Sequence, residues 1–251
     1  LDYGKGVWPA LPGTAVEAKA IAAITAGERE SLAGLDATSA KVTAMLPKAR
    51  YVHLATHGEF KAKALTAERK RAAEAMKARE FGDDTRKIAA KNPLGYVGLV
   101  LSNGEVFSGL SIVDLLLQNT QLVTLSACET GLGEYTAGEG VQGLQRAFHL
   151  AGCPNVVASL WKVNDEATAA LMAKFYHEMW VNKKPPIAAL RAAQLMIYYH
   201  PELIPALAKA DRGAPDFKKA IEVEAKPEKT TTNKRTDTKL WAAFILSGVG
   251  R

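Results

Sequence analysis

Apolar residues follow two alternating patterns along this chain. In the first, they continue almost without interruption for about six positions, which is typical of a buried β-strand. These runs are 51–56, 96–101, 122–127, 155–160 and 241–246. In the second, apolar residues recur every three or four positions, or strong helix formers dominate, and this predicts helices.

The segments with a helical pattern are 14–25, 39–46, 65–80, 111–117, 139–150, 165–180 and 186–199. Thr14 followed by Glu17 is a capping-box signature for the first helix. Ser111 is a plausible start for the fourth, after a turn at 102–104. Continuous apolar strands separated by helices predict an α/β fold, in which a mostly parallel sheet has helices on both faces.

Charge is concentrated in two segments of the 251-residue chain. The formal net charge is +6, of which residues 61–91 carry +5 and residues 208–239 carry +3, so the remainder carries −2. We expect a charged helix inserted at 61–91 and a long mobile basic loop at 208–239, both in a single domain. A basic folded face with interleaved aromatics, typical of a nucleic-acid binder, is not indicated, and no direct nucleic-acid partner is expected.

Only two cysteines occur, Cys128 and Cys153, so a disulfide framework is not indicated. Free thiols favour a reducing compartment, most simply the cytoplasm. No apolar run approaches the roughly 20 residues needed to span a bilayer, and no membrane association is expected. The chain begins at Leu1 rather than at methionine, which favours a fragment of a longer protein.

Two apolar runs end on residues that can act together in catalysis. One run ends at His57, and another leads to Cys128, with glycines close behind each. In parallel α/β sheets, sites gather at the carboxyl ends of strands, so these residues can meet across 71 positions of sequence. A thiol with a pKa near 8.5 needs a nearby base, and imidazole can serve as one. The backbone N–H groups of Gly58 and Cys128 are candidates for an oxyanion hole.

Each of these residues also has a purely structural interpretation. A single cysteine at a strand end is commonly a small buried apolar residue, and a single histidine is commonly a buried polar residue with satisfied hydrogen bonds. The occurrence of both at strand ends beside glycines favours the catalytic interpretation. His53 lies inside its strand and is expected to be structural.

Other candidate sites have weaker signals. His149 and Cys153 offer two metal ligands without companions, so no metal site is expected. Glycines at 131, 133, 138 and 140 lack the spacing and the Lys-Ser/Thr ending of a phosphate-binding loop. No Gly-x-Ser-x-Gly elbow occurs, which excludes the usual serine α/β hydrolase. No cofactor is expected.

Taken together, these motifs resemble those of a known family. The similarity covers nearly the whole chain except 61–91 and 208–239, and it is with the CHAT domain, a caspase-like peptidase domain found with TPR repeats in bacteria. The matching motifs are Leu-Ala-Thr-His-Gly at 54–58, Leu-Ser-Ala-Cys-Glu-Thr-Gly-Leu-Gly at 125–133, Gly-Glu-Gly at 138–140, Ala-Gly at 151–152, Val-Ala-Ser-Leu-Trp at 157–161, Leu-Pro-Gly-Thr at 11–14 with Glu-Ala at 17–18, and Trp-Ala-Ala-Phe at 241–244.

The resemblance implies a caspase–hemoglobinase fold, with His57 as acid and base and Cys128 as nucleophile. The chain departs from the caspase signature, since Ser126 stands where that signature has glutamine and Glu-Thr follows the cysteine. A caspase-like preference for aspartate at the P1 position is therefore not implied. The gap between histidine and cysteine exceeds the roughly 50 residues of caspases because of the segment 61–91.

The segment 161–166, Trp-Lys-Val-Asn-Asp-Glu, resembles part of separase, a caspase-fold relative that cuts after arginine. There an acidic residue helps to hold the basic P1 side chain, and Asp165 has the matching position, with Glu166 beside it. The alternative is that Asp165 only caps a helix beginning at Glu166.

These observations predict a cysteine endopeptidase that cleaves protein substrates after lysine or arginine. The expected partners are a protein or peptide substrate and an upstream TPR or other regulatory region. The competing hypothesis is a catalytically silent, caspase-like interaction module that binds a partner through the same cleft.

Overall fold

The computed structural model describes residues 8, 11–25, 27–80, 92–126, 137–161, 164–209, 214–224 and 236–251. Its central sheet has the strand order β1-β5-β6-β7. The strands are β1 (Tyr51–Leu54), β5 (Leu122–Leu125), β6 (Asn155–Ser159) and β7 (Phe244–Gly248). β1, β5 and β6 are parallel to one another, and β7 pairs with β6 in the antiparallel direction. The prediction of a mostly parallel sheet is confirmed.

A second, antiparallel sheet has the strand order β2-β3-β4. Its strands are β2 (Gly58–Phe60), β3 (Val97–Val100) and β4 (Val106–Ser108). Sequence analysis found β3 but not its two neighbours, because three residues are too few to establish a periodic pattern. β3 and β4 are joined through the expected turn, where Asn103 has a φ of 56°, a left-handed conformation that asparagine tolerates.

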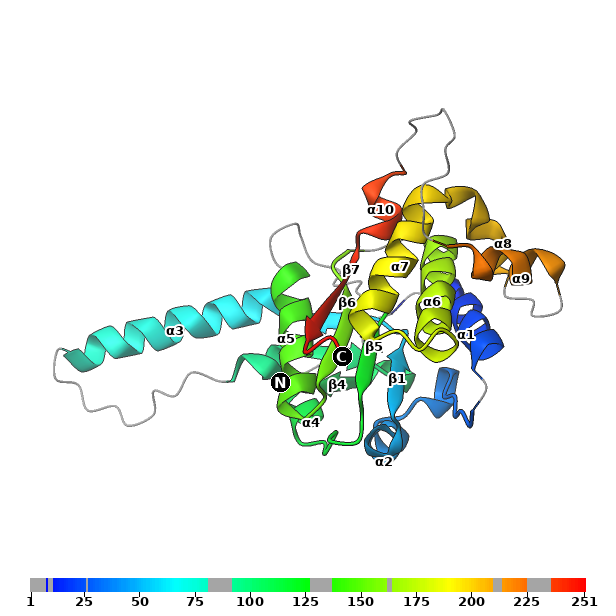
Figure 1. Ribbon diagram of the computed structural model, residues 1–251. Coiled ribbons are helices and arrows are strands. Elements are labelled where there is room, and N and C mark those ends of the chain that lie inside the picture. Colours follow the sequence, from blue (N-terminus) through cyan, green and yellow to red (C-terminus); the bar gives the residue numbers. More distant parts are fainter. Residues whose placement is uncertain are drawn as a thin grey trace.

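Helices cover both faces of the central sheet (Figure 1). The α-helices are α1 (Pro12–Ile24), α2 (Ser39–Met45), α3 (Ala62–Glu80), α4 (Gly109–Val113), α5 (Ala137–Leu150), α6 (Asp165–Trp180), α7 (Pro186–Tyr199), α8 (Ile204–Ala208), α9 (Pro215–Glu222) and α10 (Thr238–Trp241). Short 3-10 turns occupy Gly34–Asp36, Leu46–Lys48, Pro93–Tyr96, Ser102–Gly104 and Pro201–Leu203. No helix in the described ranges is long and apolar enough to cross a membrane.

The two faces of the sheet bury separate clusters of apolar residues. Leu122 and Val157 belong to the cluster beneath α1, α6 and α7. Their strand neighbours Val123 and Val156 belong to the cluster on the α5 side, which also includes the second sheet. Alternate residues of one strand thus enter opposite cores, which explains why β5 and β6 carry apolar residues on both faces.

Two predicted helix starts are corrected. Helix α1 begins at Pro12, and Thr14 Oγ1 donates to the carbonyl of Leu11 at 2.7 Å instead of capping the helix. Glu17 turns into the core, where it is 3% exposed, so it does not complete a capping box. Helix α4 is capped by Ser108, which accepts a hydrogen bond from the N–H of Ser111.

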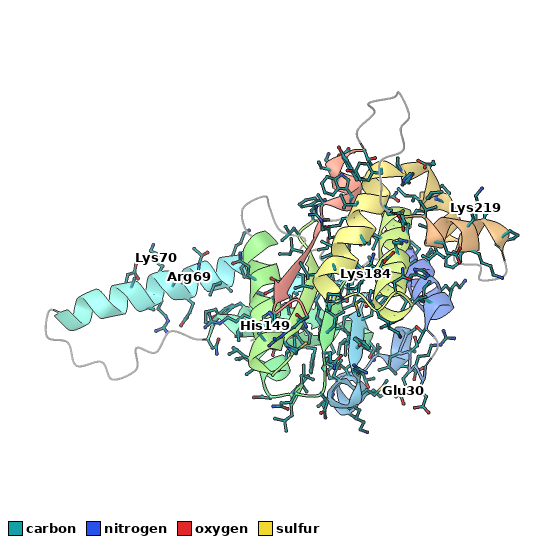
Figure 2. The ribbon with its side chains drawn as sticks, viewed as in Figure 1. Glu30, Arg69, Lys70, His149, Lys184 and Lys219 are labelled. Atoms are coloured by element: carbon teal, nitrogen blue, oxygen red, sulfur yellow. The ribbon has the colours of Figure 1, made fainter. Side chains whose placement is uncertain are left out.

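Helix α3 extends away from the body in the segment where a charged helix is expected (Figure 1). Its first half is attached through Leu65 and Ala72, which are 4% and 7% exposed. Glu68 pairs with Arg71 across one helical turn at 2.6 Å. Figure 2 shows Arg69 and Lys70 on the helix as it leaves the body. Residues 81–91 of the predicted insertion lie outside the described residues.

The expectation of a loop throughout 208–239 is wrong for its middle part. Helix α9 packs on the core through Phe217, Ala220 and Ile221, all at most 5% exposed. A buried lysine of α6, Lys174, reaches the end of this helix, where its Nζ donates to the carbonyl of Ile221 at 2.6 Å and to that of Val223 at 2.9 Å. Residues 210–213 and 225–235 lie outside the described residues.

The charge of Lys174 is balanced by Glu178, whose carboxylate lies 2.8 Å away and is also 2.7 Å from Lys184. Burial acts to raise the pKa of Glu178, but hydrogen bonds from Lys174, Lys184 and Asn182 outweigh it and lower this pKa from 4.5 to about 2. The charged carboxylate therefore stabilises the fold fully above pH 4.5, and this contribution disappears as the pH falls toward 2.

We expect Glu178→Gln to lower the free energy of unfolding by about 3 kcal/mol near neutral pH, because it leaves the Lys174 charge without its buried partner. Between pH 4.5 and pH 2, the parent protein should lose more stability than the variant. Urea unfolding followed by circular dichroism at several pH values measures both. Parallel stability curves for the two proteins over this range would show that the pair does not contribute in this way.

Candidate functional site

His57 lies in the short connection between β1 of the central sheet and β2 of the second sheet. Two contacts fix this connection to β3: the carbonyl of His57 accepts from the N–H of Val100 at 2.8 Å, and the hydroxyl of Thr56 donates to the carbonyl of Val100. The side chain of His57 is 5% exposed. The ring of Trp8 lies against it, with the two ring centroids 5.2 Å apart.

The backbone N–H of Gly58 points away from the second sheet. The residues that flank β2 bond toward β3: the N–H of Val100 donates to the carbonyl of His57, and the N–H of Lys61 donates to the carbonyl of Tyr96. Because bonded and non-bonded pairs alternate in antiparallel strands, the N–H and C=O groups of Gly58 and Phe60 face the opposite side. β2 is the edge strand of this sheet, so in the described part of the chain no further strand pairs with those groups.

Cys128 lies outside the described residues, but the strand that leads to it is placed. β5 pairs with β1 in parallel, with Leu125 opposite Leu54. The pairing continues one residue further, since the N–H of Ser126 donates to the carbonyl of Leu54 at 3.0 Å. β1 and β5 therefore end side by side at one edge of the sheet. The chain leaves β5 next to the point at which it leaves β1 toward His57.

A group of buried and partly buried polar side chains lies beneath this edge. Nε2 of His53 is 3.1 Å from Oε1 of Glu17, and the hydroxyl of Ser126 donates to the same oxygen. Nδ1 of His53 lies 3.0 Å from the hydroxyl of Tyr176, which donates to Thr124 Oγ1 at 3.0 Å. His53 is thus part of the interior, as expected.

Burial raises the pKa of Tyr176, and the charge of Glu17 acts in the same direction against the hydrogen bond to Thr124, so the phenol stays protonated. Sequence analysis did not find this group as a unit. A threonine within the apolar run of β5 was the available signal, because a buried hydroxyl needs a partner.

Asp165 and Glu166 form the exposed first turn of α6, which follows the carboxyl end of β6. The alternative in which Asp165 caps this helix is wrong: Asn164 is the cap, and its Oδ1 accepts from the N–H groups of Glu166 and Ala167 at 3.0 and 3.2 Å. The carboxylate of Asp165 instead lies over Gly13 in the first turn of α1, where a Cβ atom on the glycine would be 2.2 Å from Asp165 Cγ. Both carboxylates remain accessible at the sheet edge that carries His57.

Glu59 is a carboxylate near the candidate site that sequence analysis missed. It is two residues after His57, so the two side chains leave the backbone on the same side of the strand. Its Oε2 is buried without a hydrogen-bond partner. Burial raises the pKa of Glu59, although the charge of Lys61 opposes this.

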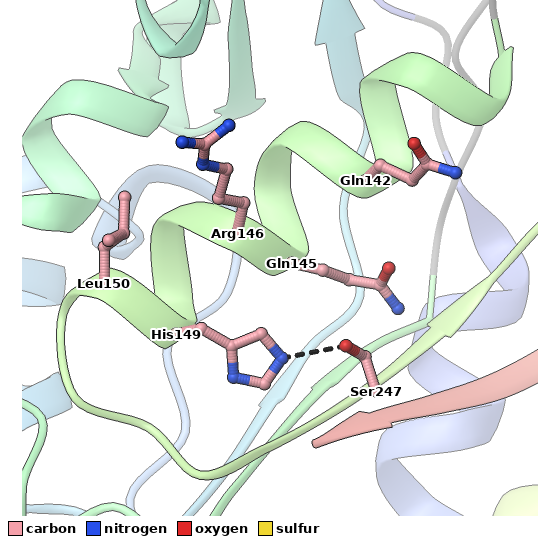
Figure 3. A pocket seen from close by; sticks show the side chains of 6 residues that line it. All are labelled: Gln142, Gln145, Arg146, His149, Leu150 and Ser247. Atoms are coloured by element: carbon pink, nitrogen blue, oxygen red, sulfur yellow. Dashed lines mark hydrogen bonds between the residues drawn. The ribbon is translucent and has the colours of Figure 1, made fainter.

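His149 and Cys153 do not form a metal pair. Nδ1 of His149 donates to the carbonyl of Cys153 at 2.8 Å, and Nε2 lies 2.9 Å from Ser247 Oγ (Figure 3). The thiol of Cys153 is free, 1% exposed and donates to the carbonyl of Asn155, and burial raises its pKa. A cavity of about 360 Å³ lies beside His149, between α5 and β7. Among the described residues, no three acidic, histidine or cysteine side chains gather as they would around a metal ion.

Of the four glycines considered as a phosphate-binding loop, the structure describes two. Gly138 and Gly140 lie within α5, so they are part of a helix and not of a loop. Residues 131 and 133 lie outside the described residues.

Comparison with known proteins gives a family and one remote relative. The family model described as the CHAT domain matches residues 2–249. Tetratricopeptide repeat protein 28 of Mus musculus is 27% identical over 189 residues, which are 69% of this chain and 7% of that protein. The chain thus spans a small fraction of the length of this relative. No solved structure matches the chain.

The contact between Trp8 and His57 predicts that the indole shields the imidazole from reagents in solution. We expect Trp8→Ala to accelerate carbethoxylation of His57 by diethyl pyrocarbonate several-fold, as quantified by peptide mass mapping. His149 is the internal control, because both of its ring nitrogens contact other residues, Cys153 and Ser247. Its carbethoxylation rate should be the same in the variant as in the parent. An unchanged rate at His57 would mean that Trp8 does not cover it.

Proposed function

Because this chain belongs to the CHAT domain family, which is related to caspase-like peptidases, we propose that it is a cysteine endopeptidase with Cys128 as nucleophile and His57 as acid and base. The observation that carries this proposal is the parallel register of β1 and β5, with Leu54 opposite Leu125. Two chain segments that leave adjacent parallel strands at one edge deliver their next residues to a common place.

In the proposed reaction, Cys128 passes its proton to His57, and the thiolate attacks the carbonyl carbon of the scissile peptide bond. The oxygen of the tetrahedral intermediate accepts hydrogen bonds from the N–H groups of Gly58 and Cys128. The intermediate collapses, the C–N bond breaks, and His57 donates the proton to the leaving amine. Water, deprotonated by His57, then attacks the thioester, releases the carboxylate product and restores the thiol.

The edge of β2 is the proposed binding surface for an extended substrate. The outward C=O of Gly58 and the outward N–H and C=O groups of Phe60 follow His57 closely and have the geometry to pair with a peptide strand, while the N–H of Gly58 serves the oxyanion. Main-chain pairing of this kind gives affinity without sequence preference, and side-chain contacts add the preference. Helix α3 follows β2 directly, so its charged surface is proposed as an additional contact for the substrate.

A preference for lysine or arginine at P1 is proposed from the carboxylates of the site. Asp165 and Glu166 are exposed at the edge of the sheet and are the first candidates to hold the basic side chain. Glu59 is a second candidate, because its buried Oε2 lacks a partner and a guanidinium would supply one.

The regulatory partner is proposed to be a TPR-containing region of the same or an associated protein. The named relative is a tetratricopeptide repeat protein, and the chain corresponds to 7% of it. A cytoplasmic location, which the cysteine usage favours, stays a prediction. The second candidate function is a silent interaction module, and it is favoured only if the domain acts without its thiol.

We expect the purified domain, with its regulatory region when one is present, to cleave fluorogenic peptides after arginine faster than after aspartate. Cys128→Ala and His57→Ala should abolish cleavage, since each removes one partner of the proton transfer. New N-termini in a proteome incubated with the parent and with Cys128→Ala report natural cleavage sites. Faster cleavage after aspartate would refute the P1 preference, and a biological effect retained by Cys128→Ala would favour the interaction module.

Three matched variants identify which carboxylate selects the P1 side chain. Asp165→Asn, Glu166→Gln and Glu59→Gln each remove one charge and almost no volume. The variant that reduces kcat/KM for arginine substrates, but not for substrates with a neutral P1 residue, identifies the residue that holds the basic side chain.

A further inference from the structure

Glu17 is an acidic residue in a place where acidic residues are rarely found. It is 3% exposed, on a helix that otherwise presents alanine and isoleucine to the core. Burial of a carboxylate costs free energy unless partners compensate for the lost water. A fold that needed only packing would be served by an apolar residue at this position, so the contacts of Glu17 indicate what the charge contributes.

One oxygen of Glu17 contacts both strands that lead to the proposed catalytic pair. Oε1 accepts from the hydroxyl of Ser126, which follows β5 directly and precedes Cys128 by two residues. The same Oε1 lies 3.1 Å from Nε2 of His53, which belongs to β1 and precedes His57 by four residues. These contacts span 109 residues to Ser126 and link α1 to the edge of the sheet.

The imidazole of His53 is hydrogen-bonded through its other nitrogen, whereas Nε2 is buried beside Glu17 without a hydrogen-bond partner. Its Nδ1 lies 3.0 Å from the hydroxyl of Tyr176 on α6, and the Tyr176 hydroxyl is bonded to Thr124 on β5. The side chains of Tyr176 and Thr124 are at most 1% exposed. Tyr176 and Thr124 therefore have little freedom to rearrange, and Glu17 contacts β1 through His53 and the end of β5 through Ser126, so displacement at Glu17 is transmitted to both strands.

We propose that Glu17 is a positioning residue for the cysteine–histidine pair, and that its carboxylate holds the ends of β1 and β5 in the relation in which Cys128 and His57 meet. The inference rests on the proposed function, and it assigns to α1 a role in the site although α1 contributes no reacting group. Glu17 touches neither the substrate nor the reacting atoms. Its removal therefore acts on kcat through the geometry of the pair and leaves KM unchanged.

The test is the alkylation of Cys128 by iodoacetamide at pH 7, quantified by mass spectrometry on the full chain. Glu17→Gln keeps the size of the side chain and removes the charge. We expect Cys128 to react about tenfold more slowly in this variant, because a thiol displaced from its imidazole returns toward its ordinary acidity. Cys153, which is 1% exposed, reports any general opening of the fold in the same digest.

Glu178→Gln is the matched control, because Glu178 is also a 3% exposed carboxylate, but it pairs with Lys184 and with Lys174, the residue that bonds to α9. It should destabilise the protein without changing the alkylation rate of Cys128. If Glu17→Gln fails to fold by circular dichroism, Ser126→Ala removes one contact of the same oxygen and should slow alkylation in the same direction. The hydrogen bond from Ser126 to Glu17 is thereby tested while the carboxylate of Glu17 stays in place.

The outcomes separate this inference from the proposed function. An alkylation rate of Cys128 within about twofold of the parent in a folded Glu17→Gln or Ser126→Ala variant overturns the positioning role, as does an equal loss in Glu178→Gln. Failure of the parent to cleave any peptide counts against the proposed peptidase and is a separate readout. Where the parent cleaves, a reduced kcat with unchanged KM in Glu17→Gln supports the positioning role.

Discussion

The parallel pairing of β1 with β5 is the constraint on which the rest of this structure depends. The register that places Leu54 opposite Leu125 extends to the N–H of Ser126, so the two strands end together. A shift of the pairing by one residue would turn every side chain of β5 to the opposite core and would separate the chain ends that follow. The buried clusters on both faces therefore fix the same register that the proposed site requires.

The polar group beneath this edge differs from the apolar cores, because burying polar side chains costs free energy unless each meets a partner. Glu17, His53 and Tyr176 come from three elements, and His53 lies in contact with both of the others. Such groups specify one arrangement, because other arrangements leave a buried charge without a partner. The pair Lys174 and Glu178 acts in a comparable way at α9, where it attaches a short amphipathic helix to the body.

The sequence predicted the elements that repeat a pattern over many residues. The bounds of α6 and α7 agree with the predicted segments 165–180 and 186–199, and the parallel strands are found where the apolar runs are. The antiparallel strands β2 and β4 were missed because of their shortness. Helix α9 was missed because its many charged residues concealed Phe217 and Ile221, which hold it on the core.

The candidate site was predictable only in part, because its geometry depends on contacts between distant residues. His57 was recognisable from its position after an apolar run and before glycine. Glu17 was assigned to a local capping box, whereas its partner Ser126 is 109 residues away. For Asp165, the adjacent Asn164 took the capping role, which only the backbone conformation reveals.

The most direct measurement of the central claim is covalent labelling of Cys128 at pH 7 by a peptidyl acyloxymethyl ketone that ends in arginine. Adjacent strand ends that bring Cys128 and His57 together predict rapid labelling of Cys128 in the parent protein. They also predict much slower labelling in His57→Ala, in which the thiol is present but lacks its base. Equal labelling of the two proteins would contradict the account.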